Sequence, residues 1–513
     1  MLSIDAKALG NRPTGKRMSV LTNSLQSSLS TKPTPTAVTV TTPIFRDLSL
    51  PKPLRPGSKF AGMRVHFVGI GGSGMNGLAR VLLDCGAIIS GSDKSPNRAV
   101  FDLTQRGVKI SRTQHGELLD KNIDLVVRTA AVPDSHLEIK AANALGLQVI
   151  KYAKLLGEVM QERLGVAIAG THGKSTTTAM TALALLECGL DPSFVVGGTA
   201  PQLGGVGSRS GGGDAFVAEA CEYDRSFHNL APTVAVILNI EEDHLDCYKN
   251  IYEIIESFRK FAGIVPQGGK IIANGRDANV AKVVMNAGVP VETVSIAGDT
   301  TWSVHPRGII NGCHQGQVLL NGRPIANLRL SVAGEHNLMN ATMALAAACA
   351  CGADPEKAAA AISSFKGVDR RMTEMGTYSG ATVVDDYGHH PTEIRATLAA
   401  LREKYAPERL ICVFQPHQHS RTRFLLDDFA VSFTAADETI LPDIYFVRDS
   451  EEERTAVCAQ DLAKKIIAAG QNAVHIPDFA AIVSYLKTHA RPGDLIVTMG
   501  AGNVNEIGAE LVG

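Results

Sequence analysis

A glycine-rich loop around Lys174 has the residue types and spacing of a phosphate-binding site. It reads Gly170-Thr-His-Gly-Lys-Ser-Thr176 and follows the short apolar run 165–169. Backbone N–H groups of such a loop can cradle phosphates, the Lys174 amine can neutralise the β and γ oxygens, and the Ser175 hydroxyl can bind Mg²⁺. Ile168 stands where a longer P-loop would have begun, so the loop is shortened to G-x-x-G-K-S. The Lys-Ser-Thr-Thr-Thr start of the next helix favours a nucleoside triphosphate over a chance turn rich in Gly and Thr.

Acidic residues follow the next two apolar runs. Glu219-Ala-Cys-Glu-Tyr-Asp224 comes after the run 215–218, and Asn239-Ile-Glu-Glu-Asp-His244 comes after the run 234–238. If both runs are strands, these segments emerge at the same sheet edge as the phosphate loop. Carboxylates there suit Mg²⁺, which prefers oxygen ligands. Imidazole suits softer metals, so residue type alone leaves His244 as either a ligand or a surface histidine.

A second glycine-rich loop, Gly69-Ile-Gly-Gly-Ser-Gly74, lies between a β-rich run and a helical pattern. Its glycines allow a tight turn and a close backbone approach to a diphosphate at the helix N-terminus. An acid 19 residues after Gly74 stands where it could bond ribose hydroxyls. NAD and a UDP conjugate fit this pattern equally well, and a tight turn without a ligand is the plainer alternative. The residues predicted to bind this nucleotide are Gly69, Gly71, Gly72, Ser73, Gly74 and Asp93.

Charged and imidazole side chains gather in three later segments, Arg370-Arg371, 385–393 and 415–423. Their four histidines could suggest a zinc site, but no cysteine joins them and two are adjacent. Contacts to an anionic substrate are therefore favoured, with plain solvated charge as the alternative. The four histidines are His389, His390, His417 and His419.

Length and composition limit the number of domains, the kinds of partner and the cellular compartment that the protein can have. At roughly 150 residues per domain, 513 residues predict about three domains. Lys+Arg is 50 and Asp+Glu is 51, which argues against nucleic acid or an anionic membrane as a partner and favours small molecules. The nine cysteines include no C-x-x-C pair, so a reducing cytoplasm is expected. Apolar runs such as 179–186 are too short to cross a bilayer, and nothing in the sequence indicates an oligomeric state.

Strand-like runs alternate with helical patterns from Met63 onward, which predicts an α/β fold with parallel sheets. The Ser-, Thr- and Pro-rich segment before it is predicted to be a disordered tail, with an organelle transit peptide as the less favoured alternative. A helix is expected over 152–164, leading from the first domain into the second. The expected boundaries are 1–60 for the tail, 61–160 for a Rossmann-like first domain, 161–366 for a central P-loop domain and 367–513 for a Rossmann-like C-terminal domain.

In their order along the chain, the motifs resemble those of the Mur ligase family. The resemblance covers residues 63 to about 505 and rests on nine motifs, HFVGIGGSGMNGLA, GTHGKSTTT, VAEACEYDRSF, ILNIEEDHLDCY, GEHNLMN, GVDRRM, VDDYGHHPTE, FQPHQHSRTR and TMGAGN. It implies a three-domain fold in which the first domain binds a UDP-sugar, the central domain binds ATP, and the C-terminal domain receives an amino acid and closes over ATP.

The resemblance also implies roles for single residues. It gives ATP binding to Gly170, Thr171, His172, Gly173, Lys174, Ser175, Thr176, Asn337, Asn340 and Arg371. It implies that Mg²⁺ is bound by Ser175, Glu219 and His244, and that the amino-acid carboxylate is bound by His417 and Arg421. The catalytic residues that it implies are Lys174, Glu219, His244, Arg371 and Asp386. The chain departs from the family pattern where Cys221 replaces an acid, Met372 replaces an aromatic residue and Gln418 replaces a basic one. The changes at Cys221 and Gln418 bear on substrate contacts, including amino-acid preference.

The implied reaction joins L-alanine to the carboxylate of UDP-N-acetylmuramate in peptidoglycan synthesis. ATP would first phosphorylate the carboxylate, and the amine would then displace phosphate. Such chemistry needs positioning and charge neutralisation, which lysine, arginine and metal ligands supply. A sibling ligase that adds another amino acid or a peptide is the nearest alternative. Two alternatives belong to other classes of protein. A nicotinamide dehydrogenase could use the first glycine loop but would need neither the phosphate loop nor the metal ligands. A P-loop regulatory or binding protein would bind a nucleotide without performing chemistry.

Overall fold

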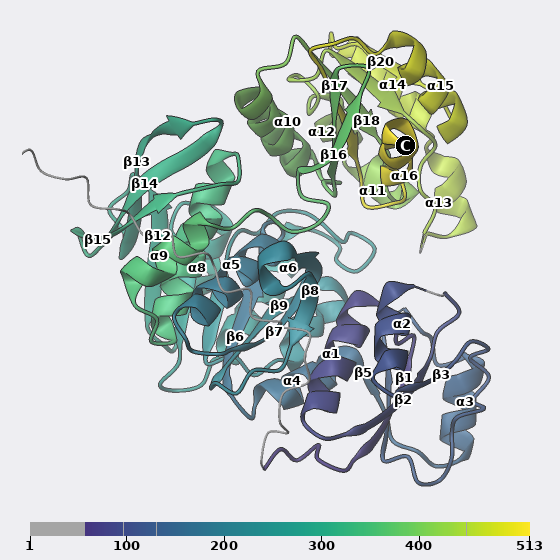
Figure 1. Cartoon of the computed structure of the whole chain (residues 1–513), viewed down its shortest axis with the longest axis vertical. Helices are drawn as coiled ribbons and strands as arrows, with labels where there is room; N and C mark the ends of the chain where they lie inside the picture. Colours follow the sequence, from purple (N-terminus) through teal and green to yellow (C-terminus); the bar gives the residue numbers. More distant parts are fainter. Residues whose placement is uncertain (1–56, 96, 130, 448) are drawn as a thin grey trace, which may run out of the picture. The chain divides into compact units, whose positions relative to one another are not determined.

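The computed structural model describes residues 57–95, 97–129, 131–447 and 449–513. Its strands form three sheets, each built from one continuous stretch of the chain (Figure 1). We refer to the regions built on them as the first, second and third domains. Most of the predicted tail lies outside the described residues, but Phe60, near its predicted end, is buried. None of the helices among the described residues is long and apolar enough to span a bilayer.

The first sheet is parallel, with the strand order β3-β2-β1-β4-β5. The chain runs outward from β1 to β2 and β3, then returns to the other side of β1 to form β4 and β5. The loop after β1 therefore lies at the point where the strand order reverses, which is where such sheets bind ligands. The elements are β1 (Arg64–Val68), α1 (Ser73–Asp84), β2 (Ile88–Ser92), α2 (Arg98–Gln105), β3 (Lys109–Ser111), β4 (Leu125–Arg128), α3 (Leu137–Ala144) and β5 (Val149–Lys151).

The second sheet has ten strands in the order β15-β14-β13-β12-β11-β10-β6-β9-β7-β8. Strand β6 lies between β10 and β9 and runs parallel to both, so the segments that follow these three strands meet at one edge. The elements that build this half are α4 (Tyr152–Met160), β6 (Leu164–Ala169), α5 (Lys174–Glu187), β7 (Ser193–Ala200), η1 (Pro201–Leu203), β8 (Val206–Arg209), β9 (Ala215–Ala220), η2 (Tyr223–Asn229) and β10 (Val234–Ile237). Helix α4 ends at Met160, so the helix expected over 152–164 is shorter than predicted.

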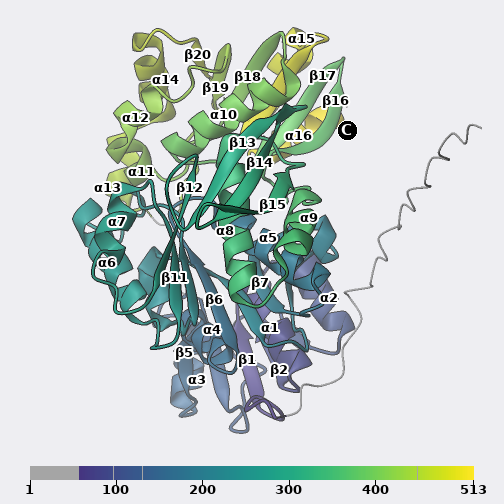
Figure 2. The same cartoon turned by 90° about the vertical axis from the view of Figure 1, so that its left-hand side faces the viewer.

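The far half of this sheet changes from parallel to antiparallel pairing after β13. Helices α8 and α9 pack near this extension, as Figure 2 shows. Helix α8 is Ala-rich and buried on nearly all sides, which explains its lack of an amphipathic pattern. The elements are α6 (Ile251–Gly263), β11 (Lys270–Asn274), α7 (Ala278–Val284), β12 (Val291–Ile296), β13 (Trp302–Ile310), β14 (Cys313–Leu320), β15 (Arg323–Arg329), α8 (Glu335–Ala350) and α9 (Pro355–Ser363).

The third sheet has the order β16-β17-β21-β18-β19-β20, with apolar cores on both faces. Its last strand, β21, lies in the middle, between β17 and β18. The elements are β16 (Thr373–Tyr378), β17 (Ala381–Asp386), α10 (Pro391–Tyr405), β18 (Arg409–Phe414), α11 (His419–Phe424), α12 (Leu426–Ala430), β19 (Glu438–Leu441), α13 (Glu451–Ala456), α14 (Ala459–Ala468), β20 (Ala473–His475), α15 (Phe479–His489), β21 (Asp494–Met499) and α16 (Asn505–Val512).

Candidate active site

The predicted phosphate loop connects β6 to the N-terminus of α5, where free N–H groups and the helix dipole favour an anion. Gly170 and Gly173 have φ angles of 148° and 84°, which side chains rarely adopt. A Cβ atom on Gly173 would also lie 2.6 Å from Oδ1 of Asn340 in α8. Both glycines are therefore required by the backbone path, and the second also by the close approach of α8.

The ammonium of Lys174 is held in place by oxygens of the surrounding loops. It donates hydrogen bonds to the carbonyls of Gly170 (2.5 Å) and Thr171 (3.1 Å) and to Oε1 of Glu222 (3.0 Å). Burial opposes the charge of this amine, but the neighbouring acidic groups, Glu222 foremost, together outweigh burial and raise the pKa of Lys174. Lys174 is therefore a fixed positive charge beside the loop. Glu222 belongs to the acidic segment 219–224 and is not one of the site residues that the sequence predicts.

The candidate metal ligand Glu219 lies at the end of β9, and the candidate ligand His244 lies in the segment after β10. Oε1 of Glu219 accepts a hydrogen bond from the Gly197 N–H (2.5 Å), and Nε2 of His244 lies 3.8 Å from Oε1 of Glu222. Two buried polar atoms here, Oε2 of Glu222 and Nδ1 of His244, lack a hydrogen-bond partner among the described residues. A buried carboxylate with an unused oxygen suits a hard cation, so the surroundings of Glu222, with Glu219 and His244 beside it, fit Mg²⁺.

A cavity of about 190 Å³ opens beside the phosphate loop. It is lined by both the second and the third domains, and eight of the predicted site residues contribute to its walls. They are His172, Gly173, Ser175, Thr176, Asn337, Asn340, Arg371 and Asp386. Gly170, Thr171 and Lys174 do not line it. Sequence reasoning missed Glu241, His336 and Glu393, which also line the cavity, because their contribution depends on tertiary contacts.

Arg371 and Asp386 reach this cavity from the third domain. Nη1 of Arg371 lies 3.6 Å from Oε1 of Glu393. Asp386 accepts hydrogen bonds from the N–H groups of Met372 (2.9 Å) and Gly388 (2.7 Å), so it holds the two segments that contain these residues in place. Burial raises the pKa of Asp386 to about 6, although the guanidinium of Arg371 opposes that change.

Arg421 and His417, the predicted anchors of an amino-acid carboxylate, lie together. Nη1 of Arg421 is 3.2 Å from Nδ1 of His417, and the His417 ring stacks on Tyr445. The other nitrogens of Arg421 bond Asp243, so an incoming carboxylate would have to share this guanidinium. A second, much smaller cavity is lined by both Arg421 and His244. The structure thus places the predicted carboxylate anchor beside a predicted metal ligand.

The glycine loop of the first domain is shaped by its own neighbours. The N–H of Gly71 donates to Oδ2 of Asp93 (2.7 Å), so this carboxylate orders the loop. A Cβ atom on Gly71 would lie within 3 Å of side-chain atoms of Asp93, Asn97 and Val100. We expected ligand contact to require this glycine, but the protein's own packing already requires it. Gly72 has only ordinary contacts around its Cβ position and ends the loop where α1 begins with Ser73.

Known proteins match the chain in all three domains. The "Mur ligase family, catalytic domain" matches residues 64–164, the "Mur ligase middle domain" matches 168–348, and the "Mur ligase, glutamate ligase domain" matches 370–502. A UDP-N-acetylmuramate–L-alanine ligase of Caldanaerobacter subterraneus is 43% identical over 88% of this chain and 97% of its own length.

Two solved structures are similar along most of the chain. The UDP-N-acetylmuramate–alanine ligase of Thermotoga maritima has a TM-score of 0.73 at 24% identity, which supports the three-domain fold, and the match covers 88% of this chain and 98% of that one. A murein peptide ligase from Psychrobacter arcticus has a TM-score of 0.66 at 29% identity, with the same coverage. Matched in every domain, and similar in sequence to a relative across 88% of its length, the chain belongs to the Mur ligase family.

Proposed function

We propose that this protein joins L-alanine to the carboxylate of UDP-N-acetylmuramate in an ATP-dependent reaction of peptidoglycan synthesis. The observation that carries the proposal is the 43% identity to an L-alanine ligase along 88% of the chain. The geometry supports it, because one cavity is lined by residues of the phosphate loop and by Arg371 and Asp386 of another domain. Residues 61–160 would bind the UDP-sugar, 161–366 would bind ATP, and 367–513 would bind the amino acid.

In this reaction the muramyl carboxylate attacks the γ-phosphorus of ATP, which releases ADP and leaves an acyl-phosphate. Lys174, charged and fixed by Glu222, would neutralise the transferred phosphoryl group. Arg371 would add a second positive charge from the third domain. Asn337 and Asn340 of α8, bonded to each other at 3.2 Å, would contact the nucleotide.

The neutral amine of L-alanine then attacks the acyl carbon, phosphate leaves, and an amide forms. Arg421 and His417 would hold the carboxylate of the amino acid, and the small cavity next to them favours a small side chain. Ser175, Glu219 and His244 would hold Mg²⁺, which, when bound, offsets the charge of the phosphates. Closure of the third domain over the cavity would exclude water, which would otherwise hydrolyse the acyl-phosphate.

We also propose that the reaction takes place in the cytoplasm, where ATP is available. All nine cysteines are free, as a reducing compartment requires.

The test is phosphate release by the full chain with ATP, UDP-N-acetylmuramate and one amino acid at a time. Release should require all three substrates, and L-alanine should outcompete Gly, L-Ser and D-Glu. Preference for D-Glu would indicate a sibling activity. Because the chain is similar to a murein peptide ligase, a peptide should also be tested in place of L-alanine as the substrate that supplies the amine. Phosphate release that depends on the peptide and not on L-alanine would overturn the proposal.

A further inference from the structure

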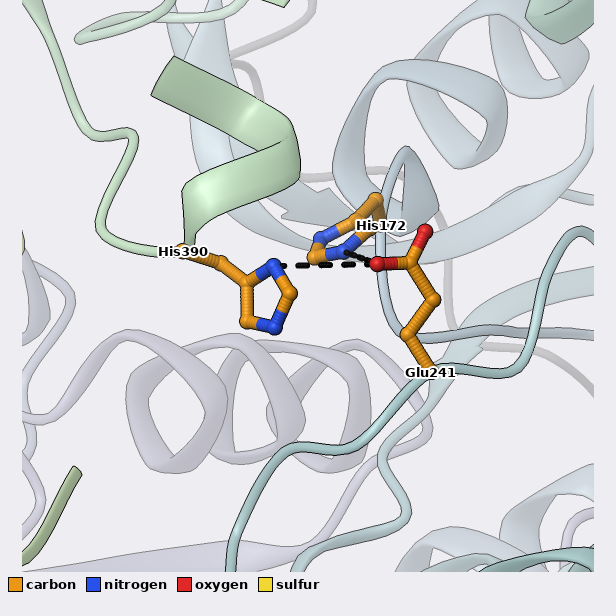
Figure 3. Close-up of side chains that lie close together, drawn as sticks. All are labelled: His172, Glu241 and His390. Atoms are coloured by element: carbon orange, nitrogen blue, oxygen red, sulfur yellow. Dashed lines mark ion pairs between the residues drawn. The ribbon is translucent and has the colours of Figure 1, made fainter. Parts of the chain in front are cut away.

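Two imidazoles and a carboxylate, His172, His390 and Glu241, lie close together where the second and third domains meet (Figure 3). His172 belongs to the phosphate loop, Glu241 follows β10, and His390 directly precedes α10 of the third domain. Nε2 of His172 lies 3.7 Å from Oε2 of Glu241, and Nδ1 of His390 lies 3.8 Å from the same oxygen. The two rings are 4.6 Å apart between centroids. Three potential ligand atoms from two domains therefore face one small volume.

These separations are too long for hydrogen bonds but close to those between ligands of one metal ion. A tetrahedral ion with bonds of about 2.0–2.1 Å holds its ligand atoms about 3.3–3.4 Å apart. The two nitrogen–oxygen distances exceed that spacing by only a few tenths of an ångström, and all three candidate ligand atoms lie within 4.8 Å of one another. Both ring nitrogens of His172 are buried, and their contacts to Glu241 and Glu393 are ion pairs that lack the geometry of a hydrogen bond. Small side-chain movements would thus bring all three atoms onto one ion.

The far sides of both rings have the partners that metal-binding histidines usually have. Nδ1 of His172 lies 3.2 Å from Oε1 of Glu393, and Nε2 of His390 lies 3.0 Å from the carbonyl oxygen of Glu242. Such outer contacts fix the tautomer and aim the other nitrogen at the metal. The hydroxyl of Thr392 orients Glu241 by donating to Oε2 at 2.6 Å. One contact competes with a metal, since Nδ1 of His390 also accepts a long bond, 3.3 Å, from the N–H of Thr392.

We propose that His172, Glu241 and His390 form a site for a borderline transition metal such as Zn²⁺, separate from the proposed Mg²⁺ site. Two imidazoles and one carboxylate are the ligands of many protein zinc sites, whereas Mg²⁺ prefers oxygen. The ion would tie the phosphate loop to the third domain. It would also occupy two residues that line the nucleotide cavity, so it should compete with ATP. Metal binding without substrates tests the site, so the result does not depend on the proposed reaction.

The experiment is titration of the full, metal-free chain with Co²⁺, followed by visible absorption, and with Zn²⁺, followed by calorimetry. The wild type should bind one equivalent of Co²⁺ with the strong absorption of a four-coordinate ion, and Zn²⁺ should displace it. His390→Asn should lower the Zn²⁺ affinity at least 10-fold, because asparagine still caps α10 but lacks the imidazole. Glu241→Gln should have a similar effect, which guards against a folding defect in one variant.

Two controls identify the site. His475→Asn removes another imidazole of the third domain, one that pairs with a single carboxylate 2.9 Å away, and should leave the affinity unchanged. His244→Ala, at the proposed Mg²⁺ site, should also retain the Co²⁺ spectrum. A spectrum lost in His244→Ala but kept in His390→Asn would overturn the proposal. So would a weak, six-coordinate spectrum in the wild type, or equal affinities in the wild type, His390→Asn and Glu241→Gln.

Discussion

The guanidinium of Arg421 donates two hydrogen bonds, of 3.0 and 2.7 Å, to one carboxylate oxygen of Asp243, 178 residues earlier in the chain. Both side chains are buried, with exposed fractions of 6% and 7%. Burial alone would raise the pKa of Asp243, but Arg421 holds it well below its usual value. Asp243 directly precedes His244, so this ion pair couples the third domain to the candidate metal ligands of the second.

Arg421→Lys should raise the KM for L-alanine at least about 10-fold and change the KM for ATP little. Lysine keeps the charge but loses the planar fork that can bond Asp243 and a substrate carboxylate at once. Steady-state kinetics with each substrate varied in turn measures both constants. Arg423→Lys is the matched control, because Arg423 lies on the same helix but pairs with Glu453 at the surface. Equal changes in both KM values would contradict the assignment.

Lys174→Ala should lower turnover about 10²-fold or more, because the charge that faces the transferred phosphoryl group is lost. The substitution also leaves Glu222 buried without its cation, so folding must be checked by thermal unfolding. Lys174→Met combined with Glu222→Gln removes both charges and serves as the second variant. UDP-sugar affinity should remain intact in each protein. Turnover near that of the wild type would rule out the role given to Lys174.

His244→Ala should raise the Mg²⁺ concentration needed for half-maximal activity without changing UDP-sugar affinity. Nε2 of the imidazole lies 3.8 Å from a carboxylate oxygen of Glu222 and of Asp243, so His244 stands among oxygen groups that favour a bound cation. Activity measured over a Mg²⁺ titration tests this. His228→Ala, an imidazole bonded to the carbonyl of Ser257, provides a comparison outside the site. If the two variants have the same Mg²⁺ dependence as the wild type, His244 is not a ligand.

Gly72→Ala should weaken UDP-N-acetylmuramate binding several-fold while ATP binding is unchanged. Its Cβ position has no protein atom closer than 3.5 Å, so a loss of affinity would report a collision with the ligand. Gly71→Val is less informative, because the protein's own side chains leave no room for it. Calorimetric titration of the UDP-sugar, ATP and NAD into the wild type and Gly72→Ala gives the answer. Tight NAD binding with no response to the UDP-sugar would revive the dehydrogenase alternative.

Stability should fall as the pH drops from 7 to 5, in part through His336. Burial, assisted by the charge of Arg371, lowers the pKa of His336 to about 4, from an ordinary value near 6.5. At pH 5 the unfolded chain binds this proton and the folded protein does not, so stability present above pH 6.5 is lost on acidification. His336→Gln should reduce the loss by about 1–2 kcal/mol, measured by urea denaturation at both pH values. The exposed His305→Gln variant should behave as the wild type.

Local patterns were enough to predict the strand–loop–helix units around Gly170 and Gly69, because each lies within one short segment. They also predicted that the segments after β9 and β10 flank the phosphate loop, since neighbouring parallel strands end at one edge. The partners of Arg421 and His172 could not be predicted. Each contacts a carboxylate far away in sequence, and no periodicity encodes a contact between separate sheets. The antiparallel strands β14 and β15 were missed for a different reason. The sequence prediction relied on strands that alternate with helices, whereas β13, β14 and β15 follow one another without a helix between them.

The central place of β21 in the third sheet has a consequence for protein synthesis. This strand is made last, yet it pairs with β17 and β18, and the N–H of Gly500 donates to the carbonyl of Asp386. On the ribosome, the phosphate loop emerges and can fold long before β21 exists. A chain that ends before Asp494 is therefore expected to lack an ordered Asp386 and a complete nucleotide cavity, so unfinished chains should not hydrolyse ATP during translation.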